Sequence, residues 1–79
     1  MADSNPPWKS AGGDSTKIGF TNANGQKCLG HRDVKGTDHL QYAYKVECTR
    51  CGFVYGANGS DLHLRKCPQC QGGAAGIRY

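Results

Sequence analysis

The sequence contains few large apolar side chains for its length. Only eleven of its 79 residues are Leu, Ile, Val or Phe, roughly 14%, which is below the ~20% at which strongly charged chains stay disordered. The net charge is only +4, so self-repulsion does not predict disorder here. A core this thin needs a cross-link, a metal or a partner. The composition therefore argues against an enzyme with a deep pocket and favours a non-catalytic, cross-linked module.

Long hydrophobic runs are also missing. No stretch is apolar for long enough to cross a bilayer, and no signal-peptide core follows Met1. We therefore expect an intracellular protein, cytoplasmic or nuclear, with no membrane partner. Thiols stay reduced in those compartments, so cysteines there bind metal more often than they form disulfides. The odd number of cysteines, five, also argues against a framework built only of disulfides.

The basic charge is unevenly distributed along the chain. Residues 1–26 are neutral overall, and residues 27–79 carry eight basic against four acidic side chains. A basic module is typical of a nucleic-acid partner. Nothing in the composition points to a small-molecule substrate.

The first sixteen residues differ in composition from the rest. Residues 1–16 are rich in proline, glycine and serine, and after Met1 they contain one large apolar side chain, Trp8. Such a segment cannot bury enough surface to offset the entropy of ordering, so we predict a flexible tail. Trp8 is then either a residue that folds back over the small core or an aromatic anchor for a partner.

Residues 17–41 are predicted to form an extension of the main domain. Residues 17–30 resemble a β-hairpin, because Ile18 and Phe20 alternate with smaller neighbours and Asn24–Gly25 is a strong two-residue turn signal. Residues 31–41 are polar and contain a glycine, which predicts a loop.

Residues 42–79 are predicted to contain three short strands. Residues 42–47 alternate, with Tyr42, Tyr44 and Val46 on one face. Residues 52–55 form the second predicted strand, residues 56–61 a turn, and residues 62–66 the third, with Leu62 and Leu64 on its buried face. The glycine-rich end is unsuited to a helix, and no helix is predicted elsewhere.

Four of the five cysteines form a motif with metal-binding spacing. Two C-x2-C pairs are separated by fifteen residues, a pattern typical of a tetrahedral metal site: Cys48, Cys51, Cys67 and Cys70. Two thiolates on one tight turn can hold an ion at ~2.3 Å each, and a second turn completes the tetrahedron. The cofactor expected is one structural Zn²⁺. With four thiolates and that ion counted, the net charge falls to about +2.

The stretch CTRCGFVY…RKCPQC resembles a zinc ribbon over about residues 42–72. The resemblance implies an all-β, metal-stapled fold in which two cysteine turns hold a three-stranded antiparallel sheet, here with an N-terminal β-hairpin extension. It implies metal ligation by the four cysteines and no catalytic activity. Zinc ribbons bind DNA or RNA, or dock within larger assemblies.

The same two cysteine turns are also similar to those of rubredoxin, in which C-x2-C-G-aromatic-apolar-Tyr is followed by C-P-x-C. That resemblance implies iron and electron transfer. The interval of fifteen residues is much shorter than in rubredoxins, and their acidic surface and aromatic core are missing.

A second metal site is a further hypothesis. Cys28 and His31 form a C-x2-H pair that His39, with Asp33 or Asp38, can complete. Alternatively, Cys28 is a buried core residue and His31 lies in solvent. A third interpretation makes Cys28 a nucleophile activated by His31, although no oxyanion or substrate motif accompanies it.

The candidate nucleic-acid contacts are the basic side chains around the predicted ribbon: Lys45, Arg50, His63, Arg65 and Lys66. His63 and Arg65 are predicted on the exposed face of the third strand, near Lys45. Arg50 and Lys66 adjoin the cysteine turns and can instead offset thiolate charge. The tyrosines and phenylalanines of residues 42–55 are either stacking platforms for bases or core residues, and we expect at least two in the core.

Three classes of function follow from the sequence. The first is a non-catalytic zinc module that binds nucleic acid as an accessory component of a larger assembly. The second is a protein-interaction subunit without nucleic-acid contact. The third is a redox or catalytic protein that uses iron or Cys28.

Overall fold

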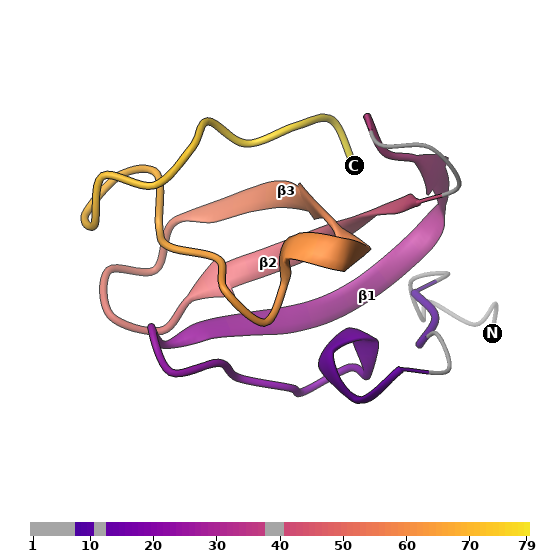
Figure 1. Cartoon of the computed structure of the whole chain (residues 1–79), viewed down its shortest axis with the longest axis horizontal. Coiled ribbons are helices and arrows are strands. Elements are labelled where there is room, and N and C mark those ends of the chain that lie inside the picture. Colours follow the sequence, from indigo (N-terminus) through magenta and orange to yellow (C-terminus); the bar gives the residue numbers. More distant parts are fainter. Residues whose placement is uncertain (1–7, 11–12, 38–40) are drawn as a thin grey trace, which may run out of the picture.

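The computed structural model describes residues 8–10, 13–37 and 41–79 (Figure 1). Three strands, β1 (Gln26–Lys35), β2 (Tyr42–Cys48) and β3 (Val54–Asn58), form one antiparallel sheet in the order β1-β2-β3. Two single-turn 3-10 helices, η1 (Asp14–Thr16) and η2 (Gly59–Asp61), lie outside it. The described residues therefore form a small all-β structure, as the composition predicts. They include no helix long and apolar enough to cross a membrane.

The β2–β3 hairpin confirms the strand predicted over residues 42–47. The strand predicted over residues 52–55 lies at a shifted position. β2 covers the predicted residues 42–47, and its register with β3 runs from Ala43↔Asn58 to Glu47↔Val54. β3 begins two residues later than predicted, because residues 49–53 form the turn that presents Cys51. Residues 56–58, predicted as a turn, instead belong to β3, where Lys45 pairs with Gly56.

The first part of β1 corresponds to the predicted second arm of the hairpin over residues 17–30, and its continuation was not predicted. Residues 31–35, predicted as a loop, continue one ten-residue strand that pairs with β2 through a register shifted on both sides of His31. The alternation is broken at the irregularities, where Gly30 has φ 98° and Asp33 has φ 67°. Register shifts interrupt the alternation of buried and exposed side chains along a strand. The polar residues 31–35 therefore have the sequence pattern of a loop.

The hairpin predicted over residues 17–30 is present, but its turn is centred on Ala23 and Asn24, one residue earlier than the predicted Asn24–Gly25 pair. Thr21 bridges Lys27, and the Gly25 N–H donates to the Asn22 carbonyl at 3.0 Å. Gly25 has φ 77°, which is the left-handed conformation that a turn glycine supplies. The predicted boundary at residue 41 falls between β1 and β2, which are paired strands of a single sheet.

The strand predicted over residues 62–66 is wrong. These residues follow η2 as turns, with Leu62 buried and Leu64 70% exposed, so the two leucines do not share a face. The Asn22 side-chain amide donates to the carbonyl oxygens of Leu62 and Arg65 at 2.8 and 2.9 Å. In a strand, these carbonyls would accept hydrogen bonds from a neighbouring strand. Here the Asn22 side chain of the first hairpin supplies those hydrogen bonds.

Part of the predicted flexible tail is docked on the sheet. Lys9 exchanges two backbone hydrogen bonds with His31, at 2.8 and 3.0 Å, which places Trp8–Ser10 beside β1. The flexibility of residues 1–16 stays a prediction, and within them the segment of Lys9 pairs with the sheet. Residues 1–7 and 11–12 of the predicted tail lie outside the described residues.

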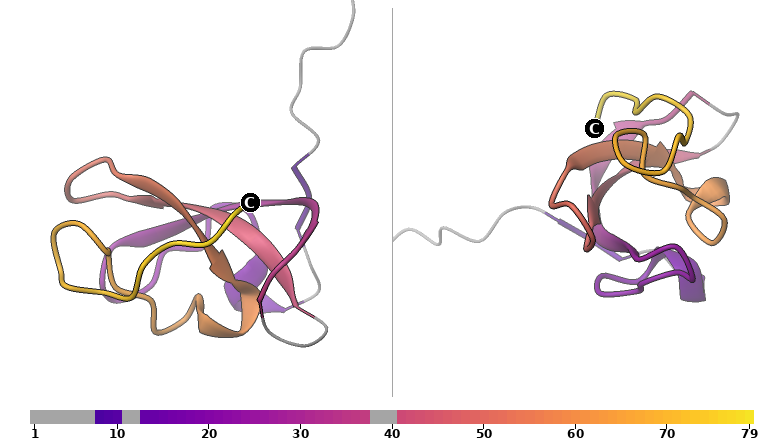
Figure 2. Two further views of the ribbon diagram at one scale, coloured as in Figure 1. Left: turned by 90° about the horizontal axis from the view of Figure 1, so that it is seen from above. Right: turned by 90° about the vertical axis from the view of Figure 1, so that its left-hand side faces the viewer.

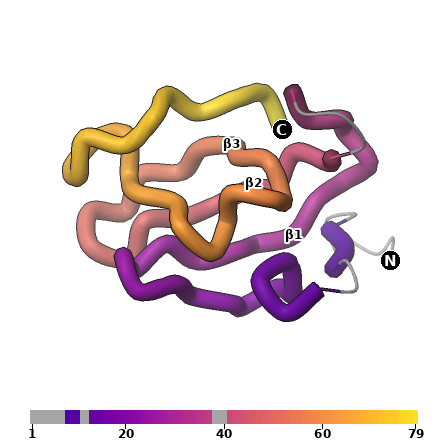
Figure 3. The backbone as a smooth tube through the Cα atoms, viewed as in Figure 1, coloured from indigo at the N-terminus to yellow at the C-terminus, as the bar shows by residue number. Residues whose placement is uncertain are grey.

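The end of the chain returns along the opposite edge of the sheet. The Ile77 N–H donates to the Gly56 carbonyl at 2.9 Å, so the last residues run beside β3. Figure 3 shows this return as the yellow trace above β3. Residues 71–79 contain no helix, as predicted.

The hydrophobic core lies on one face of the sheet and is small. Its buried members come from all three strands and from the segment after η2: Cys28, Tyr44, Val46, Tyr55, Ala57 and Leu62. Phe20 and Phe53 pack against it. Two aromatic residues are thus in the core, as expected, and Figure 2 shows the segment around η2 covering that face.

The two leucines after η2 provide a direct test of this fold. Leu62→Ala should lower the free energy of unfolding by about 2–4 kcal/mol, because it empties a buried site. Leu64→Ala, at an exposed site, should change it by less than about 0.5 kcal/mol. Urea denaturation of both variants in one buffer measures the difference. Equal effects of the two substitutions would contradict the placement of this segment.

Candidate metal centre

The first cysteine turn joins β2 to β3. Cys48 is the last residue of β2, and its N–H donates to the Phe53 carbonyl at 2.9 Å, which closes the hairpin. The Gly52 N–H donates back to the Cys48 carbonyl at 2.8 Å, and Gly52 has φ 82°. This tight turn places the Cys51 sulfur beside that of Cys48. Glycine is required because a side chain is strained at this φ.

The second cysteine turn lies at the same end of the molecule, at the left in Figure 1. The N–H groups of Gln71 and Gly73 both donate to the Cys67 carbonyl, at 3.1 and 2.9 Å. The N–H groups of Gln69 and Cys70 point at the Cys67 sulfur, at 3.3 and 3.4 Å. Such N–H groups stabilise a thiolate, as in metal-binding cysteine turns.

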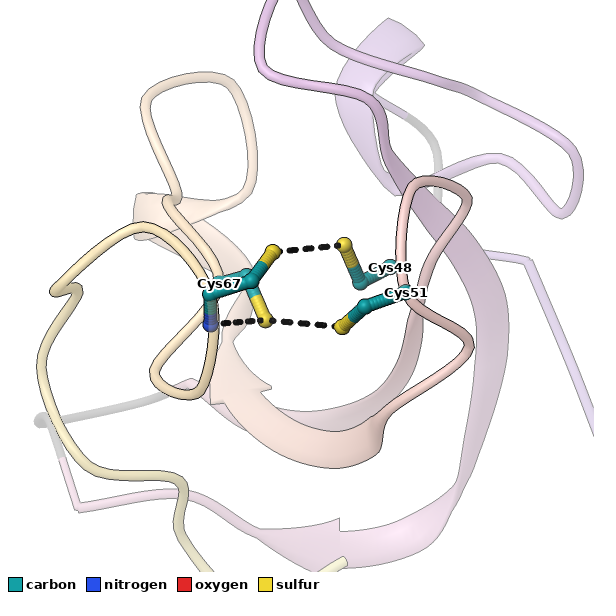
Figure 4. Close-up of side chains that lie close together, drawn as sticks. Cys48, Cys51 and Cys67 are labelled. Carbon is teal, nitrogen blue, oxygen red and sulfur yellow. Dashed lines mark hydrogen bonds between the residues drawn. The ribbon is translucent and has the colours of Figure 1, made fainter.

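The four sulfurs form a compact cluster with the dimensions of a tetrahedral metal site. All four lie within 4.8 Å of one another. The Cys48 and Cys70 sulfurs are 3.7 Å apart, and so are those of Cys51 and Cys67. Four sulfurs bound at ~2.3 Å to one ion lie about 3.8 Å apart in a regular tetrahedron. The donor set therefore fits a metal ion, and Figure 4 shows the side chains of the two turns facing each other.

The site is buried on one side only. Cys48 and Cys67, which lie against the sheet, are fully buried, whereas Cys51 and Cys70 are exposed. A metal ion held here is therefore anchored to the core through one cysteine of each turn. None of the five cysteines forms a disulfide.

Two glutamines that the sequence analysis missed connect the cysteine turns to β1. The Gln26 side-chain amide donates to the Cys48 sulfur at 3.3 Å and to Gln71 Oε1 at 3.2 Å. Gln71 Oε1 also accepts from the Cys67 N–H at 2.8 Å. Tyr55 donates its hydroxyl to Gln26 Oε1 at 2.9 Å. The only sequence signal for Gln26 is its position between a turn and a strand, which does not indicate contact with a sulfur.

The surroundings of the sulfurs make the thiols unequal before any metal binds. Burial opposes ionisation of Cys48, but hydrogen bonds from Gln26 and from the N–H groups of Cys51 and Arg50 lower its pKa to about 6. Loss of solvent around the Cys70 sulfur, together with the neighbouring thiols of Cys51 and Cys48, raises its pKa to about 12. The hydrogen bonds around Cys48 therefore favour its thiolate, which is the form that binds a metal ion.

The proposed second site is only partly within the described residues. Cys28 is a core residue, and burial raises the pKa of its thiol. His31, expected in solvent in the alternative interpretation, is buried and stacks on Tyr42 with ring centroids 4.3 Å apart. Its Nδ1 accepts from the Asp33 N–H at 3.1 Å. His39 and Asp38 lie outside the described residues, so this hypothesis stays a prediction.

The basic candidates separate into one structural residue and four surface residues. Arg65, predicted to be exposed, is buried, and its guanidinium donates to the carbonyl oxygens of Ala74 and Ala75 over the ring of Tyr55. Its hydrogen bonds fix the segment of Ala74 and Ala75, because the carbonyls of these residues lack strand partners. The others are exposed or half-buried: Lys45, Arg50, His63 and Lys66.

Substitution of two buried cysteines separates a metal ligand from a core residue. Cys48→Ser should abolish stoichiometric metal binding, because it removes one of the four clustered ligands. Cys28→Ser should retain one ion per chain while lowering the thermal stability. Native mass spectrometry counts the ions in both variants. Loss of the ion in Cys28→Ser, or its retention in Cys48→Ser, would contradict this assignment.

Comparisons with known proteins add no relative. No family model, no curated protein and no solved structure matches this chain. The assignment of the centre therefore rests on its own geometry. The chain has a three-stranded antiparallel sheet and a cluster of four cysteines that can hold a metal ion.

Proposed function

We propose that this chain is a non-catalytic, zinc-stapled module that binds nucleic acid as an accessory component of a larger assembly. Zinc is favoured because four thiolates in a tetrahedron are the usual ligand set of structural zinc sites. The ion would be held by the four clustered cysteines and would fix the β2–β3 turn to the second cysteine turn. In this proposal the ion has a structural role only.

The observation that carries the proposed partner is the uncompensated basic surface. Among the described residues, carboxylates form salt bridges with only two of the ten lysines and arginines, Lys9 and Lys17. Exposed basic side chains without such a partner occur on both sides of the sheet and at the cysteine turns: Arg32, Lys35, Arg50, Lys66 and Arg78. Phosphates are the natural counter-ions for such a surface.

The surroundings of Cys28 support a non-catalytic role. Its side chain is 1% exposed within the apolar core, and burial raises the pKa of its thiol. A buried, protonated thiol is a poor nucleophile because the thiolate is the reactive form. The two cavities lined by Arg65 are shallow depressions between the η2 segment and the returning chain, of about 310 and 180 Å³. Asp61 and Arg65 line both of them, and neither lining contains a histidine or a second carboxylate.

The proposed function predicts binding that weakens as salt is added. Three to five phosphate contacts give a slope of log K against log salt of about −2 to −4, measurable by gel shift with labelled oligonucleotides. Lys45→Glu should weaken binding several-fold at constant salt. Lys17→Glu is the matched control, because it changes the charge equally at a lysine that already has an acidic neighbour.

Two results would overturn the proposed function. One is the absence of any shift with single-stranded or duplex probes at low salt. The other is an affinity that does not change with salt, because phosphate contacts release counter-ions. A stoichiometric protein partner recovered without nucleic-acid binding would instead support the protein-interaction class.

A further inference from the structure

An aromatic and basic cluster lies on the face of the sheet opposite the core. We define the Trp8 cluster as the side chains of Trp8, Arg32, Lys45 and Tyr79. The Arg32 guanidinium carbon lies 5.5 Å from the centre of the indole ring, and the Lys45 Nζ lies 5.1 Å from it. The rings of Trp8 and Tyr79 have centroids 6.3 Å apart. Two cations and two aromatic rings thus meet at one place.

Four separate segments build this cluster. Pairing of Lys9 with His31 brings Trp8 to the edge of β1, where it meets Arg32. Lys45 points to this face because it alternates along β2 with the core residues Tyr44 and Val46. The fold therefore brings the first and last described residues of the chain together over one sheet.

Gly56 allows the end of the chain to close over the sheet. Gly56 lies beside Lys45 in the register, and Ile77 bridges it on its other side. A Cβ at residue 56 would lie 2.2 Å from the Ile77 carbonyl oxygen and 3.0 Å from a ring carbon of Tyr79. A side chain there would push the returning chain off the sheet. Arg32 adds a second tie, because it donates to the Tyr79 carbonyl at 2.7 Å.

Among the described residues, no side-chain carboxylate pairs with the charges of the Trp8 cluster, and Arg32 is engaged by the main-chain oxygen of Tyr79. Two like charges near one ring repel each other, and the cation–π attraction of each contributes only ~0.5–1 kcal/mol at an exposed site. An anion bound between them would relieve this repulsion. The face is therefore complementary to a ligand that combines negative charge with a flat ring.

We propose that the Trp8 cluster binds single-stranded nucleic acid, with phosphates at Arg32 and Lys45 and an unpaired base stacked on Trp8. This inference rests on the proposed function and names the surface and the strandedness of the ligand. A phosphate held by either cation brings the base of the same or the next nucleotide within reach of the indole ring. In a duplex the faces of the bases are covered by their neighbours, so only an unpaired base can stack on a side chain.

The chain contains a single tryptophan and four tyrosines, so fluorescence excited at wavelengths that only the indole absorbs reports on the Trp8 cluster alone. We expect titration of the metal-loaded protein with an unlabelled single-stranded oligonucleotide to quench this fluorescence. A duplex of the same sequence should quench it little and bind at least several-fold more weakly. The salt dependence of the quenching should match that of the gel shift.

Substitutions then separate stacking from charge. Trp8→Ala should weaken single-strand affinity by about ten-fold, whereas Trp8→Phe should restore most of it because a phenyl ring also stacks. Lys17→Ala is the control, because it removes one positive charge outside the Trp8 cluster. Metal content and far-UV circular dichroism of Trp8→Ala establish that the fold is retained, and the quenching of the unsubstituted protein needs no variant.

The outcomes distinguish this inference from the proposed function. Salt-dependent binding without quenching, equal affinity for duplex and single strand, or unchanged affinity in Trp8→Ala would overturn the inference and leave the proposed function standing. No binding of either probe would overturn both. Quenching of the unsubstituted protein by single strands alone, together with a gel-shift affinity that falls in Trp8→Ala and is recovered in Trp8→Phe, would support both.

Discussion

Four cysteine sulfurs from two turns, separated by fifteen residues, meet within 4.8 Å at one end of the sheet. The rest of the structure depends on this convergence. Cys48 ends β2, and Cys67 begins the segment that runs back beside β3. An ion bound by both cysteine turns would therefore fix the β2–β3 hairpin to that segment. Binding free energy at such a site is also folding free energy. A bound ion would thereby supplement a small core, whose cluster among the described residues has six buried members.

Polar groups carry an unusual share of the packing around that centre. Gln26 is 2% exposed and hydrogen-bonds to a sulfur, to Gln71 and to the Tyr55 hydroxyl. Asn22 satisfies two carbonyls of the segment after η2, and buried Arg65 satisfies two carbonyls of the returning chain. Most members of this buried polar network are hydrogen-bonded, as a stabilising network requires, and among the described residues Arg65 Nε is the one buried side-chain nitrogen or oxygen atom without a partner. In this chain these polar groups order the glycine-rich segments that apolar contacts cannot.

The sequence was sufficient for features with local signals and insufficient for those that depend on distant partners. The cysteine spacing, the alternation in residues 42–47 and the turn signal at Asn24–Gly25 each encode their structure within a few residues. The second half of β1 was missed because its register shifts break the alternation. Residues 62–66 were misassigned because Asn22 satisfies their carbonyls. The docking of Trp8 had no local signal, because it depends on backbone pairing between Lys9 and His31.

The central claim is that a metal ion bound by the four cysteines holds this thin-cored sheet together. It is tested most directly by thermal unfolding of the protein, followed by far-UV circular dichroism, before and after chelation. The account predicts that chelation under reducing conditions abolishes the cooperative transition and the β-sheet signal, and that stoichiometric Zn²⁺ restores both. An unchanged spectrum and melting temperature in the metal-free protein would contradict it.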